Sequence, residues 1–171
     1  SSIEISANDS NSISNINNEQ MKILKNSYSK FDVIMFSVID YDFRYQRPQH
    51  FASNFARNGH RVFYINANYH NCNDIQLIED NLYVVNFSNE RVSAIYETDW
   101  SSTKKQIYSQ LDRLLYDYCI RDSIIIVDYP NWINAAEYLI EKCGFKIITD
   151  YMDDFTGFLN PAEEMIKTNY I

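Results

Sequence analysis

The chain has 171 residues, of which 46% are hydrophobic and 15% aromatic, enough to bury the core of about one domain. Its formal net charge of −8 argues against nucleic acid as a partner, because a surface that binds nucleic acid must be basic. Only 3 glycines are present, which excludes both the glycine-rich dinucleotide-binding motif and the phosphate-binding P-loop. The 3 cysteines are widely spaced and odd in number, and they predict free thiols in a reducing compartment. No apolar run reaches the length of a transmembrane helix.

The first half of the chain predicts an extension followed by a strand–helix–strand unit. Residues 1–30 are rich in Ser and Asn and predict a flexible or helical extension. Residues 31–39 are almost unbroken in their apolar character, as in a strand that is buried on both faces. Pro48 suits the first position of a helix that Gly59 ends, and residues 60–66 form the next predicted strand. Such a unit implies that its two strands are parallel.

The second half of the chain continues the alternation of strands and helices. Short apolar runs predict strands at residues 82–87, 123–128 and 145–151. Apolar residues at helical spacing, with N-cap and Pro signals, predict helices at residues 99–120, at residues 133–142 and from Pro161 onward. Residues 68–81 are polar and turn-prone. These elements predict an α/β fold with a Rossmann-like, doubly wound parallel sheet in the strand order 3-2-1-4-5.

The candidate site lies at the carboxyl ends of the strands, because open α/β sheets bind ligands where the strand order reverses. Three turns are expected to meet there, at residues 40–47, 129–132 and 153–158. The residues from these turns that we expect to bind substrate are Arg44, Gln46, Arg47, Gln49, His50, Tyr129, Trp132 and Phe158. Asp153 and Asp154 are the candidate catalytic residues, since two adjacent carboxylates repel each other and one of them then suits the role of a base.

The two arginines of the first turn have two interpretations. Arg44 and Arg47 stand beside a helix N-terminus, where they suit an anionic group of a ligand. Alternatively, they pair with the carboxylates of Asp40 and Asp42 and only stiffen the loop. Asp40 and Asp42 also form a D-x-D pattern of the kind that binds metal in some sugar transferases. That pattern arises often by chance and here follows the first strand, so we expect no metal site.

Other candidates also have structural alternatives. His50 either faces the ligand or caps a neighbouring loop, and Trp132 either lines the crevice or is buried against the sheet. One of the two aspartates at positions 153 and 154 either acts as the base or caps its own loop. Both interpretations of each residue stay open on the sequence.

Two segments resemble a known family. The letters FRYQRPQH at residues 43–50, followed by GHRVFY at residues 59–64, resemble the segment fRxQRPQxLAxxLAxxGHxVxY of bacterial glycosyltransferases with the GT-B architecture. The letters YMDDFTGF at residues 151–158 are similar to the segment YDCMDDFSGF that the same proteins carry after their fifth strand. Similar proteins build surface polysaccharides with two Rossmann-like domains. The N-terminal domain mainly holds the acceptor, the C-terminal domain holds the nucleotide sugar, and the active site is the cleft between them.

The resemblance implies that residues 31–171 are the N-terminal, acceptor-binding half of such an enzyme, without the C-terminal donor domain. The implied reaction transfers a sugar from a nucleotide sugar to a cell-surface glycan or a lipid-linked acceptor, without a cofactor. The implied place is the cytoplasm, at the inner face of the membrane, and the isolated half is expected to be inactive. The alternative is a non-catalytic carbohydrate-binding or regulatory module. A receiver-like signalling domain is excluded, because the third strand ends at Asn86 without a following aspartate to phosphorylate.

Overall fold

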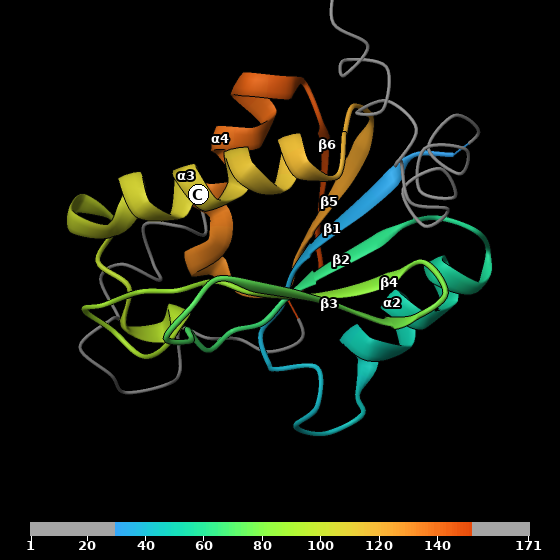
Figure 1. The fold of residues 1–171 in the computed structure, drawn as a ribbon, viewed down its shortest axis with the longest axis horizontal. Coiled ribbons are helices and arrows are strands. Elements are labelled where there is room, and N and C mark those ends of the chain that lie inside the picture. The colour runs from blue at the N-terminus through green and yellow to red at the C-terminus, as the bar shows by residue number, and fades with distance from the viewer. Residues whose placement is uncertain (1–29, 152–171) are drawn as a thin grey trace, which may run out of the picture.

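The computed structural model describes residues 30–151, which form a six-stranded sheet with helices on both faces (Figure 1). The strands are β1 (Asp32–Phe36), β2 (Val62–Ile65), β3 (Asp74–Glu79), β4 (Leu82–Asn86), β5 (Ser123–Val127) and β6 (Lys146–Thr149). The helices are α2 (Arg47–Arg57), α3 (Trp100–Asp117) and α4 (Ile133–Cys143), and two short 3-10 helices are η1 (Ile95–Glu97) and η2 (Pro130–Trp132). No helix within residues 30–151 is both long enough and apolar enough to cross a membrane.

The sheet is mostly parallel, which confirms the predicted α/β class. Its order is β3-β4-β2-β1-β5-β6, and every neighbouring pair is parallel except β3 and β4. The observed order differs from the predicted one because the prediction omits the edge strand β3, whereas the five predicted strands keep their predicted relative order. This strand lies within residues 68–81, which the sequence predicts as a polar, turn-prone stretch. β3 pairs only at the edge of the sheet and leaves most of its side chains exposed, so it needs no apolar run.

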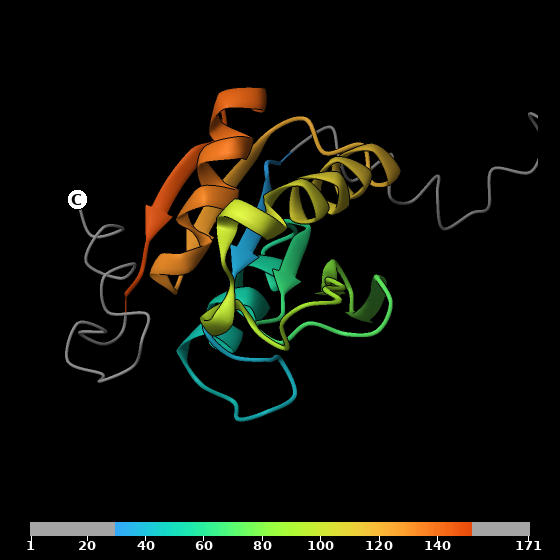
Figure 2. The same cartoon turned by 90° about the vertical axis from the view of Figure 1, so that its left-hand side faces the viewer.

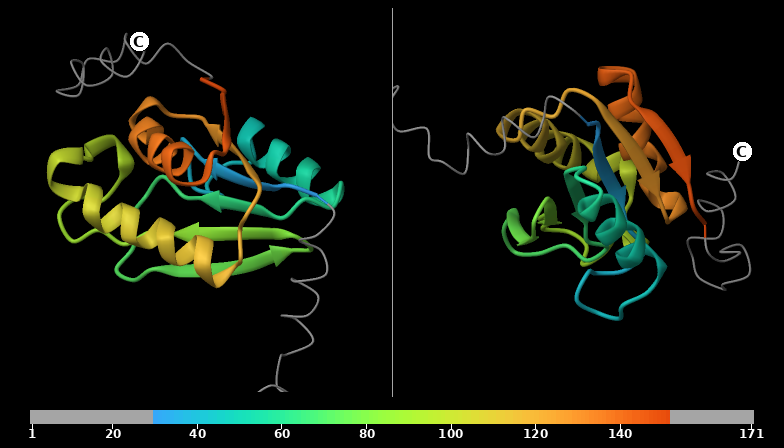
Figure 3. Two further views of the ribbon diagram at one scale, coloured as in Figure 1. Left: turned by 90° about the horizontal axis from the view of Figure 1, so that it is seen from above. Right: turned by 90° about the vertical axis from the view of Figure 1, so that its right-hand side faces the viewer.

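The apolar run of β1 is unbroken because both faces of the sheet are covered. Helix α2 lies on one face, and α3 and α4 lie on the other (Figure 1, Figure 3). Val33 and Met35 pack in the core on the α2 side, whereas Ile34 and Phe36 belong to the core on the side of α3 and α4. Since side chains alternate along a strand, a strand covered on both faces has no position left for a solvated residue.

The helix ends follow local signals. Pro48 lies in the first turn of α2, which begins one residue earlier than predicted. Asp99 is the N-cap of α3, and its carboxylate accepts a hydrogen bond of 3.0 Å from the backbone N–H of Ser101. Gly144 ends α4 with φ 73°, in the left-handed region where glycine is favoured. The capping chemistry of both later helices is thus confirmed.

A buried ion pair fixes the amino-terminal edge of the sheet. Arg61 Nε donates to Asp32 Oδ1 at 2.7 Å, and Arg61 Nη2 donates to Asp32 Oδ2 at 2.5 Å. Both side chains are buried, and Arg61 Nη1 also donates to the carbonyl oxygen of Tyr118 at 2.9 Å. This two-point contact joins the start of β1 to the residue before β2 and to the end of α3.

Candidate functional site

The loop between β1 and α2 projects from the carboxyl edge of the sheet (Figure 2). Gln49, in the first turn of α2, lies buried beneath this loop. Its Nε2 donates to the carbonyl oxygen of Arg44 at 2.7 Å, and its Oε1 accepts a hydrogen bond of 3.1 Å from the N–H of Gln46. The structure thus corrects the expectation that Gln49 faces substrate, because its amide is used to hold the loop.

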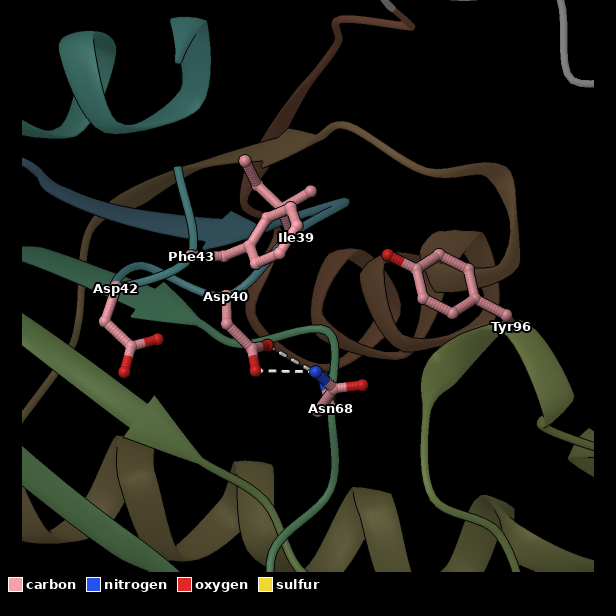
Figure 4. A pocket seen from close by; sticks show the side chains of 6 residues that line it. All are labelled: Ile39, Asp40, Asp42, Phe43, Asn68 and Tyr96. Carbon is pink, nitrogen blue, oxygen red and sulfur yellow. Dashed lines mark hydrogen bonds between the residues drawn. The ribbon is translucent and has the colours of Figure 1, made fainter. Parts of the chain in front are cut away.

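Beside this loop lies a cavity of about 460 Å³, which we call the acidic cavity (Figure 4). It is lined by Ile39, Asp40, Asp42, Phe43, Asn68 and Tyr96. The carboxylate of Asp40 accepts hydrogen bonds from the N–H and Nδ2 of Asn68, at 2.9 and 2.7 Å. The hydroxyl of Tyr96 donates to the carbonyl oxygen of Val38. Two carboxylates and two aromatic rings therefore meet at one opening, at the carboxyl ends of β1 and β2.

Aromatic side chains on the same loop face solvent. Phe43 is 65% exposed, and Tyr45 is 55% exposed. The guanidinium of Arg44 lies over the Phe43 ring, 5.4 Å from its centroid, and Arg44 makes no ion pair within residues 30–151. His50 packs edge-on against Tyr45 with 4.6 Å between ring centroids. Exposed rings beside hydrogen-bonding groups give this loop the character of a binding surface.

Arg47 is the arginine that the structure pairs. Its Nε donates to Asp150 Oδ2 at 2.9 Å, and its Nη2 contacts Asp150 Oδ1. The sequence proposed Asp40 and Asp42 as the alternative partners, and both are wrong, since Asp150 at the end of β6 takes that place. A ligand-binding role for Arg47 stays a prediction, and it now requires the ligand to compete with Asp150.

The turn after β5 is buried, in contrast to the expectation that it lines the crevice. Trp132 has no exposed surface, and its Nε1 donates to the carbonyl oxygen of Ser37 at 2.9 Å. Its ring packs against Phe36, with 5.1 Å between centroids. Tyr129 is also buried and packs edge-on against Tyr96 at 5.0 Å. The predicted substrate-binding role of Trp132 is therefore replaced by its structural alternative, and Tyr129 supports a cavity wall from behind.

Asp128 precedes this turn and is fully buried, yet neither of its carboxylate oxygens has a hydrogen-bond partner within residues 30–151. Burial raises the pKa of Asp128 to about 7, although the nearby positive charge of Arg47 lowers it. A strongly shifted pKa at the ligand-binding edge of an α/β sheet marks a candidate functional group. Asp128 is not among the site residues predicted from the sequence, although an acidic residue directly after a β-branched run is a usable signal.

A second cavity, of about 660 Å³, lies on the α2 side of the sheet, and we call it the α2 cavity. It is lined by Lys30, Phe51, Asn54, Phe55, Asn58, His60, Ile126, Ile148, Thr149 and Asp150. The aromatic and aliphatic residues in this lining come from α2, β5 and β6. Asp150 both lines the α2 cavity and forms the ion pair with Arg47 at the carboxyl edge of the sheet.

The remaining predicted residues are placed as follows. Gln46 is the N-cap of α2 and is exposed. Asp153, Asp154 and Phe158 lie outside the described residues. Within residues 30–151, no group of three His, Cys, Asp or Glu residues is arranged to hold a metal ion. Cys72, Cys119 and Cys143 are exposed free thiols, as predicted.

Two residues that line the acidic cavity, Asn68 and Tyr96, were not predicted from the sequence. Asn68 follows the second strand, where a polar side chain at the carboxyl edge was a usable signal. Tyr96 lies in η1, which no pattern in the sequence predicted.

Comparison of the chain with protein-family models gave no match, and comparison with curated proteins gave none either.

Proposed function

We propose that this domain is the acceptor-binding half of a glycosyltransferase, which transfers a sugar from a nucleotide sugar to a cell-surface glycan or a lipid-linked acceptor. The observation that carries the proposal is the acidic cavity at the carboxyl edge, with the exposed ring of Phe43 at its opening. The Rossmann-like sheet supports the proposal only as a scaffold, because one fold serves many functions.

The lining of the acidic cavity suits a sugar. The carboxylates of Asp40 and Asp42 accept hydrogen bonds, and a sugar presents many hydroxyl donors. The ring of Phe43 offers an apolar surface against which the C–H face of a sugar packs. A pocket that combines apolar walls with a few placed polar groups is the usual form of a small-molecule site.

The charge of the cavity favours an acceptor over a nucleotide sugar. Two carboxylates in the lining repel the diphosphate of a nucleotide sugar. Of the two arginines in this loop, Arg47 is already paired with Asp150, and Arg44 lies over the ring of Phe43. A neutral saccharide meets neither obstacle, so the electrostatics of this edge support binding of the acceptor.

The test is an NMR titration of the whole chain with two sets of ligands. Neutral mono- and disaccharides form the first set, and UDP- and GDP-sugars form the second. We expect at least one saccharide to shift the amide signals of Phe43 and Asn68, and we expect no binding of the nucleotide sugars. Micromolar affinity for a nucleotide sugar would mean that the donor, not the acceptor, occupies this domain.

A matched pair of variants controls the titration. Asp42→Asn removes one carboxylate of the acidic cavity and should weaken saccharide binding. Asp117→Asn removes an exposed carboxylate at the end of α3 and should leave binding unchanged. Equal effects of the two substitutions would locate the saccharide elsewhere.

A further inference from the structure

Two buried aspartates lie at opposite ends of the sheet, and their surroundings differ. Asp32, at the start of β1, receives two hydrogen bonds from Arg61, at 2.7 and 2.5 Å. Asp128, after the end of β5, is fully buried, and both of its carboxylate oxygens lack a hydrogen-bond partner in the described part of the chain. A buried polar group without a partner destabilises the fold, so Asp128 calls for an explanation that Asp32 does not need.

Asp128 stands at the point where the sheet reverses its strand order. β1 pairs with β2 on one side and with β5 on the other, and the N–H of Asp128 donates to the carbonyl oxygen of Phe36 at 3.0 Å. Because side chains alternate along a strand, Asp128 faces the same side as Ile126, toward α2. This reversal point is where open α/β sheets bind their ligands.

The groups that interact electrostatically with Asp128 connect it to residues of both cavities. On one side, burial is the main cause that raises the pKa of the Tyr64 hydroxyl, and the negative charges of Asp128 and Asp40 raise it further. Asp40 lines the acidic cavity. On the other side, Ile126 and Asp150 line the α2 cavity, and Asp150 holds Arg47, whose positive charge acts on Asp128. Asp128 is therefore connected to a lining residue of each cavity, because Tyr64 donates to the carbonyl oxygen of Ile39 at 2.9 Å and Arg47 pairs with Asp150.

We propose that Asp128 contacts the ligand directly, and that its carboxyl group exchanges a hydrogen bond with a sugar hydroxyl once the Arg47–Asp150 ion pair opens. The inference rests on the proposed function, because it names the residue through which this edge recognises a saccharide. The ion pair is partly exposed, with 51% of the Arg47 side chain and 16% of the Asp150 side chain accessible. Because solvent weakens such an ion pair, a ligand needs little free energy to open it.

The protonation state of Asp128 fits this role. Its pKa of about 7 keeps a large share of the group protonated near neutral pH. A protonated carboxyl group both donates and accepts hydrogen bonds, as a sugar hydroxyl does. The groups that interact with it electrostatically are Arg47 in the first turn of α2 and Tyr64 on β2, and Arg47 in turn pairs with Asp150, directly after β6.

The decisive experiment compares Asp128→Val with Asp32→Val in the whole chain, by thermal unfolding and by titration with a saccharide that binds the unsubstituted protein. Asp128→Val removes two unpartnered oxygens, so we expect a melting temperature at or above that of the unsubstituted protein, together with about ten-fold or greater loss of saccharide affinity. Asp32→Val leaves Arg61 buried and unpaired, so we expect a large fall in melting temperature. At temperatures where this variant is still folded, its saccharide affinity should be unchanged.

A conservative variant separates a ligand contact from a packing effect. Asp128→Asn keeps the shape of the side chain and both donates and accepts hydrogen bonds, so it should retain most of the saccharide affinity. Adding about 1 M salt shortens the screening length to about 3 Å, which weakens the Arg47–Asp150 pair. A neutral saccharide should then bind more tightly, and weaker binding would overturn the opening step.

The failures of the two proposals are distinguishable. If the unsubstituted protein binds no saccharide, the proposed function and the role of Asp128 are both overturned. If it binds a saccharide that Asp128→Val binds equally well, only the role of Asp128 is overturned. A melting temperature that falls for Asp128→Val as far as for Asp32→Val would make Asp128 a structural residue and overturn the inference as well.

Discussion

Arg47 and Asp150 form an ion pair that joins the first turn of α2 to the end of β6, although 103 positions separate them in the sequence. The positive end of the α2 dipole disfavours an arginine in the first turn, and the carboxylate of Asp150 offsets this cost. The pair also holds the positive charge of Arg47 where it acts on the buried carboxyl group of Asp128. This ion pair thus connects the first turn of α2 and the carboxyl end of β6 with Asp128, the proposed ligand-contacting residue.

Arg47→Ala should change the free energy of unfolding only slightly, because an ion pair that is half exposed contributes about 1 kcal/mol or less. The same substitution removes the positive charge that lowers the pKa of Asp128, so that pKa should rise. Urea unfolding and an NMR titration of the Asp128 carboxyl carbon measure the two effects. Arg113→Ala breaks an exposed pair on α3 and should leave the titration of Asp128 unchanged. A pKa that stays the same in Arg47→Ala would contradict the electrostatic link.

The stability of the fold should fall as pH rises through the titration of Asp128. Its pKa is about 7 in the folded protein, against about 3.9 for an aspartate in an unfolded chain. Between these values the folded state keeps a proton that the unfolded state has lost. The contribution of Asp128 is therefore fully present below about pH 4, decreases by about 1.4 kcal/mol per pH unit up to about pH 7, and stays constant above it.

Asp128→Asn should remove this dependence, because the amide does not titrate. Urea unfolding at a series of pH values measures the difference in free energy of unfolding between the variant and the unsubstituted protein. We expect that difference to grow in favour of the variant between about pH 4 and about pH 7, and then to level off. A difference that does not vary with pH would show that Asp128 has an ordinary pKa.

Asp32→Val should destabilise the domain by about 3–5 kcal/mol, because the guanidinium of Arg61 would remain buried without its carboxylate. The hydrogen bond from Arg61 to the carbonyl oxygen of Tyr118 does not replace the lost two-point contact. Asp117→Ala, which breaks the exposed pair with Arg113, should change the free energy of unfolding by about 0.5 kcal/mol or less. Comparable losses for the two variants in urea unfolding would refute the assignment of the Asp32–Arg61 pair as structural.

Phe43→Ala should weaken saccharide binding by about three- to ten-fold, the effect of losing one aromatic contact. The side chain is 65% exposed, so its removal should leave the melting temperature nearly unchanged. Tyr116, which is 82% exposed on α3, provides the matched control. Tyr116→Ala should affect neither binding nor stability. Unchanged affinity for the Phe43 variant would exclude its ring from the saccharide site.

The isolated chain should transfer no sugar from any nucleotide sugar. In the two-domain architecture that the sequence resembles, positioning of donor against acceptor in the cleft supplies much of the rate. A radiolabelled-donor assay of residues 1–171 with a saccharide that binds is the measurement. Detectable transfer would mean that the donor site lies in this domain. If a longer protein that contains this chain also binds saccharides but transfers none, the alternative of a non-catalytic carbohydrate-binding module holds.

Much of the secondary structure was determined by local sequence. The β-branched run at residues 123–127 favours a covered strand, and it forms β5. Asp99 and Gly144 act within one turn of the helix that each begins or ends. Such signals depend on neighbours in the chain, and for this reason the sequence alone predicts them.

The partners of the candidate site were decided only by the tertiary structure. Trp132 and Gln49 have polar groups that suit a ligand equally well, and only the packed fold shows that Ser37 and the backbone of the β1–α2 loop take them. Strand β3 forms because β4 offers it an edge, which no periodicity within residues 74–79 signals.

The partners and the burial of charged residues were also decided by the tertiary structure. The sequence places Arg47 in a loop with two nearby aspartates, yet its partner is Asp150, which the parallel pairing of β5 and β6 brings to the same edge. The sequence also places Asp128 directly after β5 without indicating that its side chain is buried, because burial depends on segments that are distant in the chain. Contacts between distant segments set pKa values and ion pairs, whereas sequence patterns report the chain neighbours of a residue.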